Sequence, residues 1–233
     1  MTKKCILTAI LFISAFYSLS LNAQATTEWR VQYDFEYLDD FVIDQVMDNA
    51  GNVYVTGISY SVGFHGDFCT IKYNTDGSIG WIARNNGMGG YAGDGGNSIA
   101  LDQAGNVYVT GGRDEYGRTS WCTIKYSPAG TELWVAVFHF ADSHAAKVAV
   151  DLYGNVFVTG WTPGLLTGHY DIYTIKYNSS GIEQWARRYN GIANGSDEPT
   201  SMAVDIYGNV YVTGSSYGTV TSFDYVTIKY SSS

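Results

Sequence analysis

The sequence predicts an all-β protein, a β-propeller of four four-stranded antiparallel blades. Three landmarks each recur four times in a fixed order: a segment around Asp-x-x-Gly-Asn, the segment Thr-Ile-Lys-Tyr, and a single Trp. Successive copies lie 49 to 54 residues apart. A repeat of about 50 residues that holds four short strands is typical of a propeller blade. The content of 20 Tyr, 10 Phe, 6 Trp and 27 Gly also favours pleated sheet with many turns.

Each repeat is expected to contain four strands. The first begins at the Trp, the second is the apolar run before the Asp, the third is Val-Tyr-Val-Thr, and the fourth contains Thr-Ile-Lys-Tyr. Between the second and third strands, Asp-x-x-Gly-Asn predicts a tight hairpin, because Gly and Asn tolerate positive φ. The predicted blades span about 29–78, 81–131, 134–182 and 185–233. The repeated structural residues are Asp48, Asp102, Asp151 and Asp205, and Trp29, Trp81, Trp134 and Trp185.

The propeller domain is expected to span residues 26–233. Four whole blades fit between residues 29 and 233, and no blade needs strands from both ends of this domain. We therefore expect a ring that closes by packing the fourth blade against the first. The alternative is an open half ring that pairs with a second chain.

Residues 1–25 have the pattern of a cleaved signal peptide. Lys3 and Lys4 precede an apolar run from Cys5 to Leu21, and Ala23 and Ala25 supply the small residues at a cleavage site. Cleavage after Ala25 leaves 208 residues with 11 basic and 22 acidic side chains, a net charge of −11. This charge argues against nucleic acid and anionic membrane surfaces as partners. We expect a secreted, periplasmic or cell-surface protein without membrane insertion after cleavage.

The repeat resembles the SBBP class of bacterial β-propeller repeats. The resemblance rests on Asp-x-x-Gly-Asn-Val-Tyr-Val-Thr-Gly, on Asp67-x-x-Thr-Ile-Lys-Tyr-Asn, and on a Gly-x-x-x-Trp link such as Gly77 to Trp81, and it covers residues 29 to 230. It implies an exported bacterial protein with no assigned catalytic residues.

The repeated aspartates are interpreted as Asx-turn side chains rather than calcium ligands, because each loop offers one carboxylate and calcium takes six or more oxygens. Cys69 and Cys122 occupy the same position in successive blades, too far apart for a disulfide. Both are predicted to be buried free thiols.

The loops that join the first to the second strand and the third to the fourth should emerge on one side. They carry carboxylates and two histidines that are candidate ligands of a divalent cation. The alternative is that each aspartate caps its own loop. Without such a cation, no cofactor is predicted. The candidate metal ligands are His65, His169, Asp40, Asp94 and Asp197, with Asp142 at the corresponding place in the third blade.

Gln32, Arg84 and Arg188 in the first strands either bind an anion or pair with acids. Aromatic loop residues form the other candidate site, because Tyr and Trp rings stack on sugar rings; the alternative is packing across the blade tops. These aromatic residues are Tyr60, Tyr91, Tyr116, Trp161, Tyr170 and Tyr217.

The leading functional hypothesis is a non-catalytic binding or scaffold module for extracellular protein or glycan, as a monomer or homodimer. The alternatives are a small secreted propeller enzyme and the half ring that dimerises. No Ser-His-Asp or paired-carboxylate constellation that would mark a catalytic site is evident in the sequence.

Overall fold

The computed structural model describes residues 26–62, 65–86, 94–115, 117–140, 142–164 and 168–232. The chain divides into two units, residues 1–30 and residues 31–233, and all the strands of the described residues belong to the second unit. The predicted signal peptide lies outside the described residues. Within the described part of the chain, no helix is long and apolar enough to cross a bilayer.

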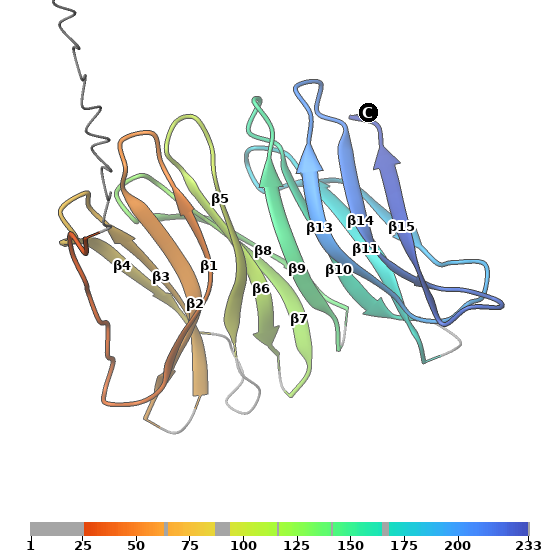
Figure 1. Ribbon diagram of the computed structural model, residues 1–233, viewed down its shortest axis with the longest axis horizontal. Coiled ribbons are helices and arrows are strands. Elements are labelled where there is room, and N and C mark those ends of the chain that lie inside the picture. The colour runs from red at the N-terminus through yellow and green to blue at the C-terminus, as the bar shows by residue number, and fades with distance from the viewer. Residues whose placement is uncertain are drawn as a thin grey trace, which may run out of the picture. The chain divides into compact units, whose positions relative to one another are not determined.

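Fifteen strands of the described residues form four antiparallel sheets in chain order (Figure 1). Sheet 1 contains β1 (Asp40–Met47), β2 (Val53–Ser61), β3 (His65–Tyr73) and β4 (Ile79–Asn85). Sheet 2 contains β5 (Gly95–Leu101), β6 (Val107–Asp114), β7 (Thr119–Tyr126) and β8 (Glu132–Phe138). Sheet 3 contains β9 (His144–Val150), β10 (Val156–Pro163), β11 (Tyr170–Tyr177) and β12 (Glu183–Tyr189). Sheet 4 contains β13 (Asp197–Val204), β14 (Val210–Tyr217) and β15 (Phe223–Tyr230).

The all-β architecture of repeated blades is confirmed, but the strands are grouped differently from the expectation. Trp81 lies on β4 and pairs with Lys72 of β3, so the Trp strand is the last strand of one sheet rather than the first of the next. Trp134 and Trp185 follow the same rule, opposite Lys125 and Lys176. The sheets therefore contain the strands of residues 40–85, 95–138, 144–189 and 197–230. Sheet 4 has three strands, and residues 29–33 are not a strand.

A β-bulge explains the Gly that ends each Val-Tyr-Val-Thr-Gly segment. In sheet 2 the register between β5 and β6 shifts between Gly96 and Ser98, opposite Gly111. A Cβ on Gly111 would lie 1.8 Å from the carbonyl oxygen of Gly95, so no side chain fits there. A bulge bends its strand and brings the two backbones together, which only Gly permits. The corresponding glycines Gly57, Gly160 and Gly214 meet backbone atoms of β1, β9 and β13 in the same way.

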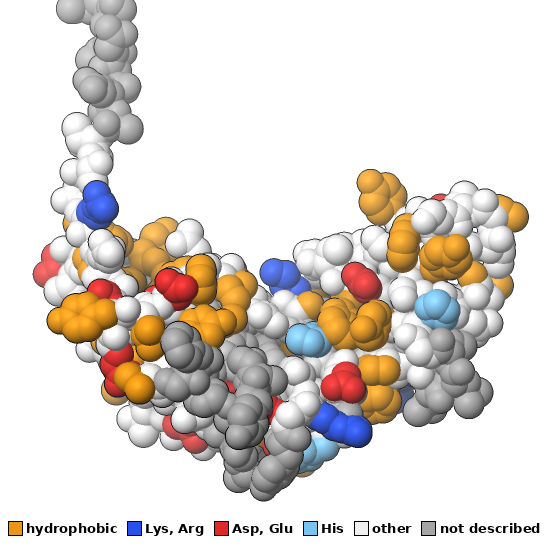
Figure 2. All heavy atoms as spheres, turned by 90° about the horizontal axis from the view of Figure 1, so that it is seen from below, with side chains coloured by type: hydrophobic (Ala, Val, Ile, Leu, Met, Phe, Trp, Pro, Cys, Tyr) orange, Lys and Arg blue, Asp and Glu red, His pale blue; other side chains and the backbone are white. Residues whose placement is uncertain are grey.

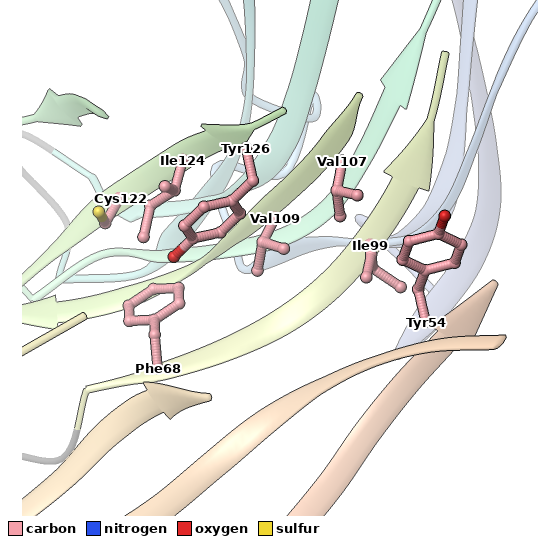
Figure 3. Close-up of a cluster of buried hydrophobic side chains, with 8 residues drawn as sticks. All are labelled: Tyr54, Phe68, Ile99, Val107, Val109, Cys122, Ile124 and Tyr126. Carbon is pink, nitrogen blue, oxygen red and sulfur yellow. The ribbon is translucent and has the colours of Figure 1, made fainter. Parts of the chain in front are cut away.

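Apolar cores lie between neighbouring sheets. Figure 3 shows Tyr54 and Phe68 of sheet 1 facing a cluster from sheet 2 that includes Ile99, Val109 and Tyr126. Two similar cores fill the next joints. Tyr108 and Trp121 of sheet 2 pack on Val156, Val158 and Ile175 of sheet 3. Phe157 and Ile172 of sheet 3 pack on Val210 and Val212 of sheet 4. Burying one such side chain contributes roughly 1.5–3 kcal/mol, so these cores hold the sheets together.

The four sheets follow one another in a row, with sheet 1 and sheet 4 at its two ends (Figure 1). Extensive contacts join β1 and β2 to β5, β5 and β6 to β9, and β9 and β10 to β13. Among the described residues, no comparable contact joins sheet 4 to sheet 1. The expected closure of the ring by the fourth blade packing on the first is therefore not seen in the part of the chain that the structure describes.

Candidate binding site

The loops of the sheets emerge at two ends. The turns that join the first two strands of a sheet, such as residues 48–52, lie at one end together with the turns between the last two strands, such as residues 74–78. We call this the turn end. The connections between the middle strands and between successive sheets lie at the opposite end (Figure 1), which we call the loop end.

The repeated aspartates lie at the turn end, each within its own hairpin. Oδ1 of Asp102 accepts the backbone N–H groups of Ala104 (2.9 Å) and Asn106 (2.8 Å). Its Oδ2 accepts the Asn106 side-chain amide (2.7 Å) and the Tyr108 hydroxyl (2.9 Å). Burial alone would raise the pKa of Asp102, but the hydrogen bonds from Asn106 and Tyr108 outweigh it and lower that pKa. This arrangement is an Asx turn. Asp48, Asp151 and Asp205 accept the corresponding hydrogen bonds from their own turns.

Two of the repeated tryptophans, Trp81 and Trp134, connect one sheet to a turn of the next sheet. Nε1 of Trp81 donates to the carbonyl of Pro128 (3.1 Å), and its ring covers Gly130, where a Cβ would lie 2.7 Å from the indole. Trp134 repeats both contacts with Ser179 (3.1 Å) and Gly181. These two tryptophans therefore hold neighbouring sheets together and are not expected to contact a ligand.

The candidate metal ligands do not come together in the described part of the chain. Oδ2 of Asp40 accepts the N–H of Phe35 (2.9 Å), and Oδ2 of Asp197 accepts the N–H of Gly191 (2.7 Å). Asp94 accepts the N–H of Asp114. Asp40 and Asp197 face the loops that precede their own strands, and Asp94 faces the end of β6, so the three carboxylates lie at three different sheets. No group of three or more His, Cys, Asp or Glu residues able to hold a metal ion is found among the described residues. His169 is exposed, the side chain of His65 lies outside what the structure describes, and Asp142 is an exposed loop residue.

The arginines of the fourth strands pair with acids. Arg84 forms an ion pair with Asp67 (2.7 Å) and stacks 3.7 Å from the ring of Phe35. Arg188 pairs with Asp171 in the same way. Of the two alternatives left open for Arg84 and Arg188, the structure shows the pairing with acids. Gln32, by contrast, is exposed.

Cys69 and Cys122 are buried free thiols, as predicted. Burial raises the pKa of Cys69 to about 11, although Arg84 opposes this rise. Burial also raises the pKa of Cys122 to about 12.

Aromatic residues gather at the loop end of sheets 3 and 4. Trp161 lies between His144 and Tyr170, with ring centroids 4.4 and 4.3 Å away. Tyr217 packs edge-on against Phe223 at 5.5 Å. Figure 2, viewed from the loop end, shows hydrophobic and histidine side chains together over this half of the molecule. Elsewhere, Tyr60 packs on Phe41 at 6.3 Å, and Tyr91 and Tyr116 lie outside the described residues.

The loop of residues 190–196 links the two aromatic groups. The hydroxyl of Ser196 accepts the N–H of Tyr170 (3.3 Å), and its carbonyl accepts the N–H of Tyr217 (3.1 Å). A Cβ on Gly195 would lie 2.6 Å from Tyr217, so Gly lets the loop backbone pass close to the ring. A hollow of about 320 Å³ opens beside this loop. It is lined by His169, Ala193, Asn194, Gly195, Ser196, Tyr217 and Phe223.

Of the residues in this region, the sequence predicts Trp161, Tyr170 and Tyr217 as site residues but not Phe223, Asn194 and Ser196. Phe223 was within reach, because it stands four residues before the Thr of Thr-Ile-Lys-Tyr, as Tyr170 does. The loop of Asn194 and Ser196 has no counterpart of the same sequence in the other repeats, so nothing in the repeat pattern indicated it.

The fold and its repeats define an all-β chain built from repeated blades of the β-propeller type. Residues 184–220 match the family model described as SBBP, a beta-propeller repeat, which confirms the predicted resemblance for that part of the chain. The matched segment starts on the last strand of sheet 3 and runs through β13 and β14, so one sequence repeat spans two sheets. No curated protein matches the chain.

Among solved structures, one similar chain is a protein of unknown function from Bacteroides caccae. It is 13% identical with a TM-score of 0.46, and the match covers 79% of this chain and 60% of that one. Another is an endo-arabinase from Bacteroides thetaiotaomicron, 11% identical, covering 86% and 78%, with a TM-score of 0.49. A third is an ulvan lyase of the polysaccharide lyase family PL25, 12% identical, covering 80% and 54%, with a TM-score of 0.49. Likenesses of this size do not bear on function.

Proposed function

We propose that the chain is an exported, non-catalytic module that binds glycan through the loop end of sheets 3 and 4. The observation that carries the proposal is the hollow of about 320 Å³ in which Tyr217 and Phe223 stand beside Asn194 and Ser196. Binding sites commonly combine aromatic walls with a few polar groups in a volume of this order.

The chemistry of the hollow suits a sugar. The faces of sugar rings are apolar and lie on aromatic rings, while their hydroxyl groups need donors and acceptors such as amides and hydroxyls. With 13 basic against 22 acidic residues, the chain repels polyanions, which favours a neutral glycan.

The test is affinity electrophoresis of the purified chain in gels that contain neutral plant or bacterial polysaccharides. We expect one of them to retard the protein, and Tyr217→Ala to weaken that binding about tenfold, which corresponds to about 1.4 kcal/mol. Tyr153→Ala is the matched control, because Tyr153 is 74% exposed at the turn end.

Equal retardation of both variants would place the glycan elsewhere and contradict the proposed site. Release of reducing ends from the retained polysaccharide would show an enzyme instead of a binding module. Absence of retardation in every gel, with capture of an extracellular protein, would favour the protein-binding alternative.

A further inference from the structure

Each of the three joints between sheets is built from the same two surfaces. We call the surface that meets the next sheet the forward face and the opposite one the rear face. The forward face of sheet 2 carries Tyr108, Thr110, Trp121 and Thr123, all buried against sheet 3. The rear face of sheet 2 contributes the residues that cover sheet 1, which are Ile99, Val107, Val109, Cys122, Ile124 and Tyr126.

The forward face of sheet 4 is uncovered in the described chain. Tyr225 is 100% exposed, whereas the residues at its position in the other sheets are at most 1% exposed. These residues are Phe68, Trp121 and Ile172. Thr227 is exposed as well, although its counterparts Thr70, Thr123 and Thr174 are buried.

The rear face of sheet 1 is the complementary half of such a joint. Val55, Cys69, Ile71 and Tyr73 form an apolar cluster there. Val42 is 67% exposed, while Gly96 and Ala145 at its position in sheets 2 and 3 are buried under the preceding sheet. A hollow of about 140 Å³ opens onto this face, as expected where a preceding sheet is absent.

Residues 31–33 already lie on this rear face as a last strand would. Tyr33 packs against the cluster of Cys69 and Ile71, and Val31 and Tyr33 line the hollow. Phe138, at the end of the last strand of sheet 2, packs 5.3 Å from Tyr173 of sheet 3, the counterpart of Cys69. Tyr33 therefore stands where the last strand of a preceding sheet would place its aromatic residue.

Sheet 4 lacks that last strand. Among the described residues, β15 pairs with β14 on one side and leaves its other edge without a strand. The segment Trp29-Arg-Val-Gln-Tyr33 has the pattern of the last strand of sheet 3, Trp185-Ala-Arg-Arg-Tyr189. An exposed edge of this kind is a template for a further strand.

We propose that two copies of this chain close one ring by exchanging this strand. Residues 29–33 of each copy pair with β15 of the other, and the forward face of sheet 4 packs on the rear face of the other copy's sheet 1. A second copy is required because Val31 and Tyr33 are held on sheet 1 at one end of the row, while β15 is at the other end (Figure 1). Two copies give eight sheets, within the four to eight blades typical of propellers, and three copies would exceed them.

The other sheets give the register of the exchanged strand. Lys176 pairs with Trp185 and Thr174 with Arg187, which places Trp29 opposite Lys229 and Val31 opposite Thr227. Directly opposed residues of antiparallel strands have Cα atoms about 4.5–5.5 Å apart, which allows a disulfide. Val31→Cys together with Thr227→Cys should therefore form a disulfide under mild oxidation, in a chain that begins at residue 26 and so lacks Cys5.

We expect a two-chain species on a non-reducing gel, in more than half of the protein. The control pairs Arg30→Cys with Thr227→Cys, because neighbouring residues of a strand point to opposite faces; it should cross-link at least tenfold less. A disulfide within single chains would overturn the proposal in favour of a ring closed by one chain. Absence of any cross-link would overturn it as well.

A second variant tests the packed face. Tyr225→Asp changes a fully exposed residue of the single chain, so the sheets should keep their fold, but it would bury a charge in the joint. Light scattering should show a single-chain mass for this variant and twice that mass for the unchanged protein and for Tyr153→Asp. An unchanged mass for Tyr225→Asp would contradict the proposed joint.

Discussion

Asp102 illustrates how a repeated acidic residue in a Gly-rich loop serves structure. Its two carboxylate oxygens accept four hydrogen bonds from the chain between Ala104 and Tyr108, so no oxygen is left over to make a metal site. The sequence pattern was sufficient for this interpretation, because the Asp, Gly and Asn of the turn are local and repeat in every sheet.

Acid should destabilise the protein through these turns. The pKa of Asp102 is lower in the folded chain than the usual value of about 3.9. The stabilisation is therefore complete above about pH 4 and is lost as the pH falls through the folded value. Asp102→Ala should lower the free energy of unfolding by about 1–2 kcal/mol at pH 7. This loss is smaller than for a buried carboxylate, because solvent screens the partly exposed Asp102 side chain.

Urea unfolding of Asp102→Ala between pH 2.5 and 7 measures this effect. The loss of stability on acidification should be smaller than in the unchanged protein, while Asp39→Ala, an exposed surface change, should behave like the unchanged protein. Parallel pH profiles for all three proteins would contradict the assigned role.

The two thiols should be inert in the folded protein. With pKa values of about 11 and 12, about one thiol in a thousand or fewer is ionised at pH 8, and the thiolate is the reactive form. A thiol reagent such as dithionitrobenzoate should label neither Cys69 nor Cys122 at pH 8 until denaturant is added, and then label both. Rapid labelling of either residue in the native protein would show that its site opens.

At the scale of the element, the repeat motif predicted the strands but not which sheet they belong to. Sequence order places Trp81 after a Gly-rich turn, at the start of a new repeat, yet its strand stays with the sheet it has just left. Pairing across a short hairpin favours this outcome, since residues 74–78 leave no room to reach another sheet. The bulge opposite Gly111 was also not predicted, because a Gly in a strand can mark a bulge, a bend or a close approach of another backbone, and the sequence does not distinguish them.

Gly111 gives a prediction at this scale. Gly111→Ala would press a methyl group onto the Gly95 carbonyl, so we expect a loss of about 1–3 kcal/mol in the free energy of unfolding. Gly80→Ala, on β4, meets only side-chain atoms of Asn74 and Lys72 and should cost far less. Thermal unfolding of the two variants compares them directly, and equal melting temperatures would contradict the account of the bulge.

At the scale of the whole molecule, stacking of repeats followed from the sequence, whereas closure and the binding surface did not. Near-identical repeats predict that the same pair of faces, the forward face of one sheet and the rear face of the next, meets at every joint, and the three cores show this. Closure depends on the angle between successive sheets, which the packing of whole side chains decides. The hollow near Tyr217 depends on the loop 190–196, which is unique to one repeat, and residues of that kind carry no periodic signal.

Within the residues that the structure describes, the row of four sheets ends in two uncovered faces, the forward face of sheet 4 and the rear face of sheet 1. Tyr225 and Thr227 at one end and Val42 with the cluster of Cys69 at the other are halves of a joint that the chain builds three times within itself. The most direct measurement is the mass of the purified chain by light scattering at micromolar concentration. A ring closed by two copies has twice the mass of one chain, and a single-chain mass that persists as the concentration rises would contradict such a ring.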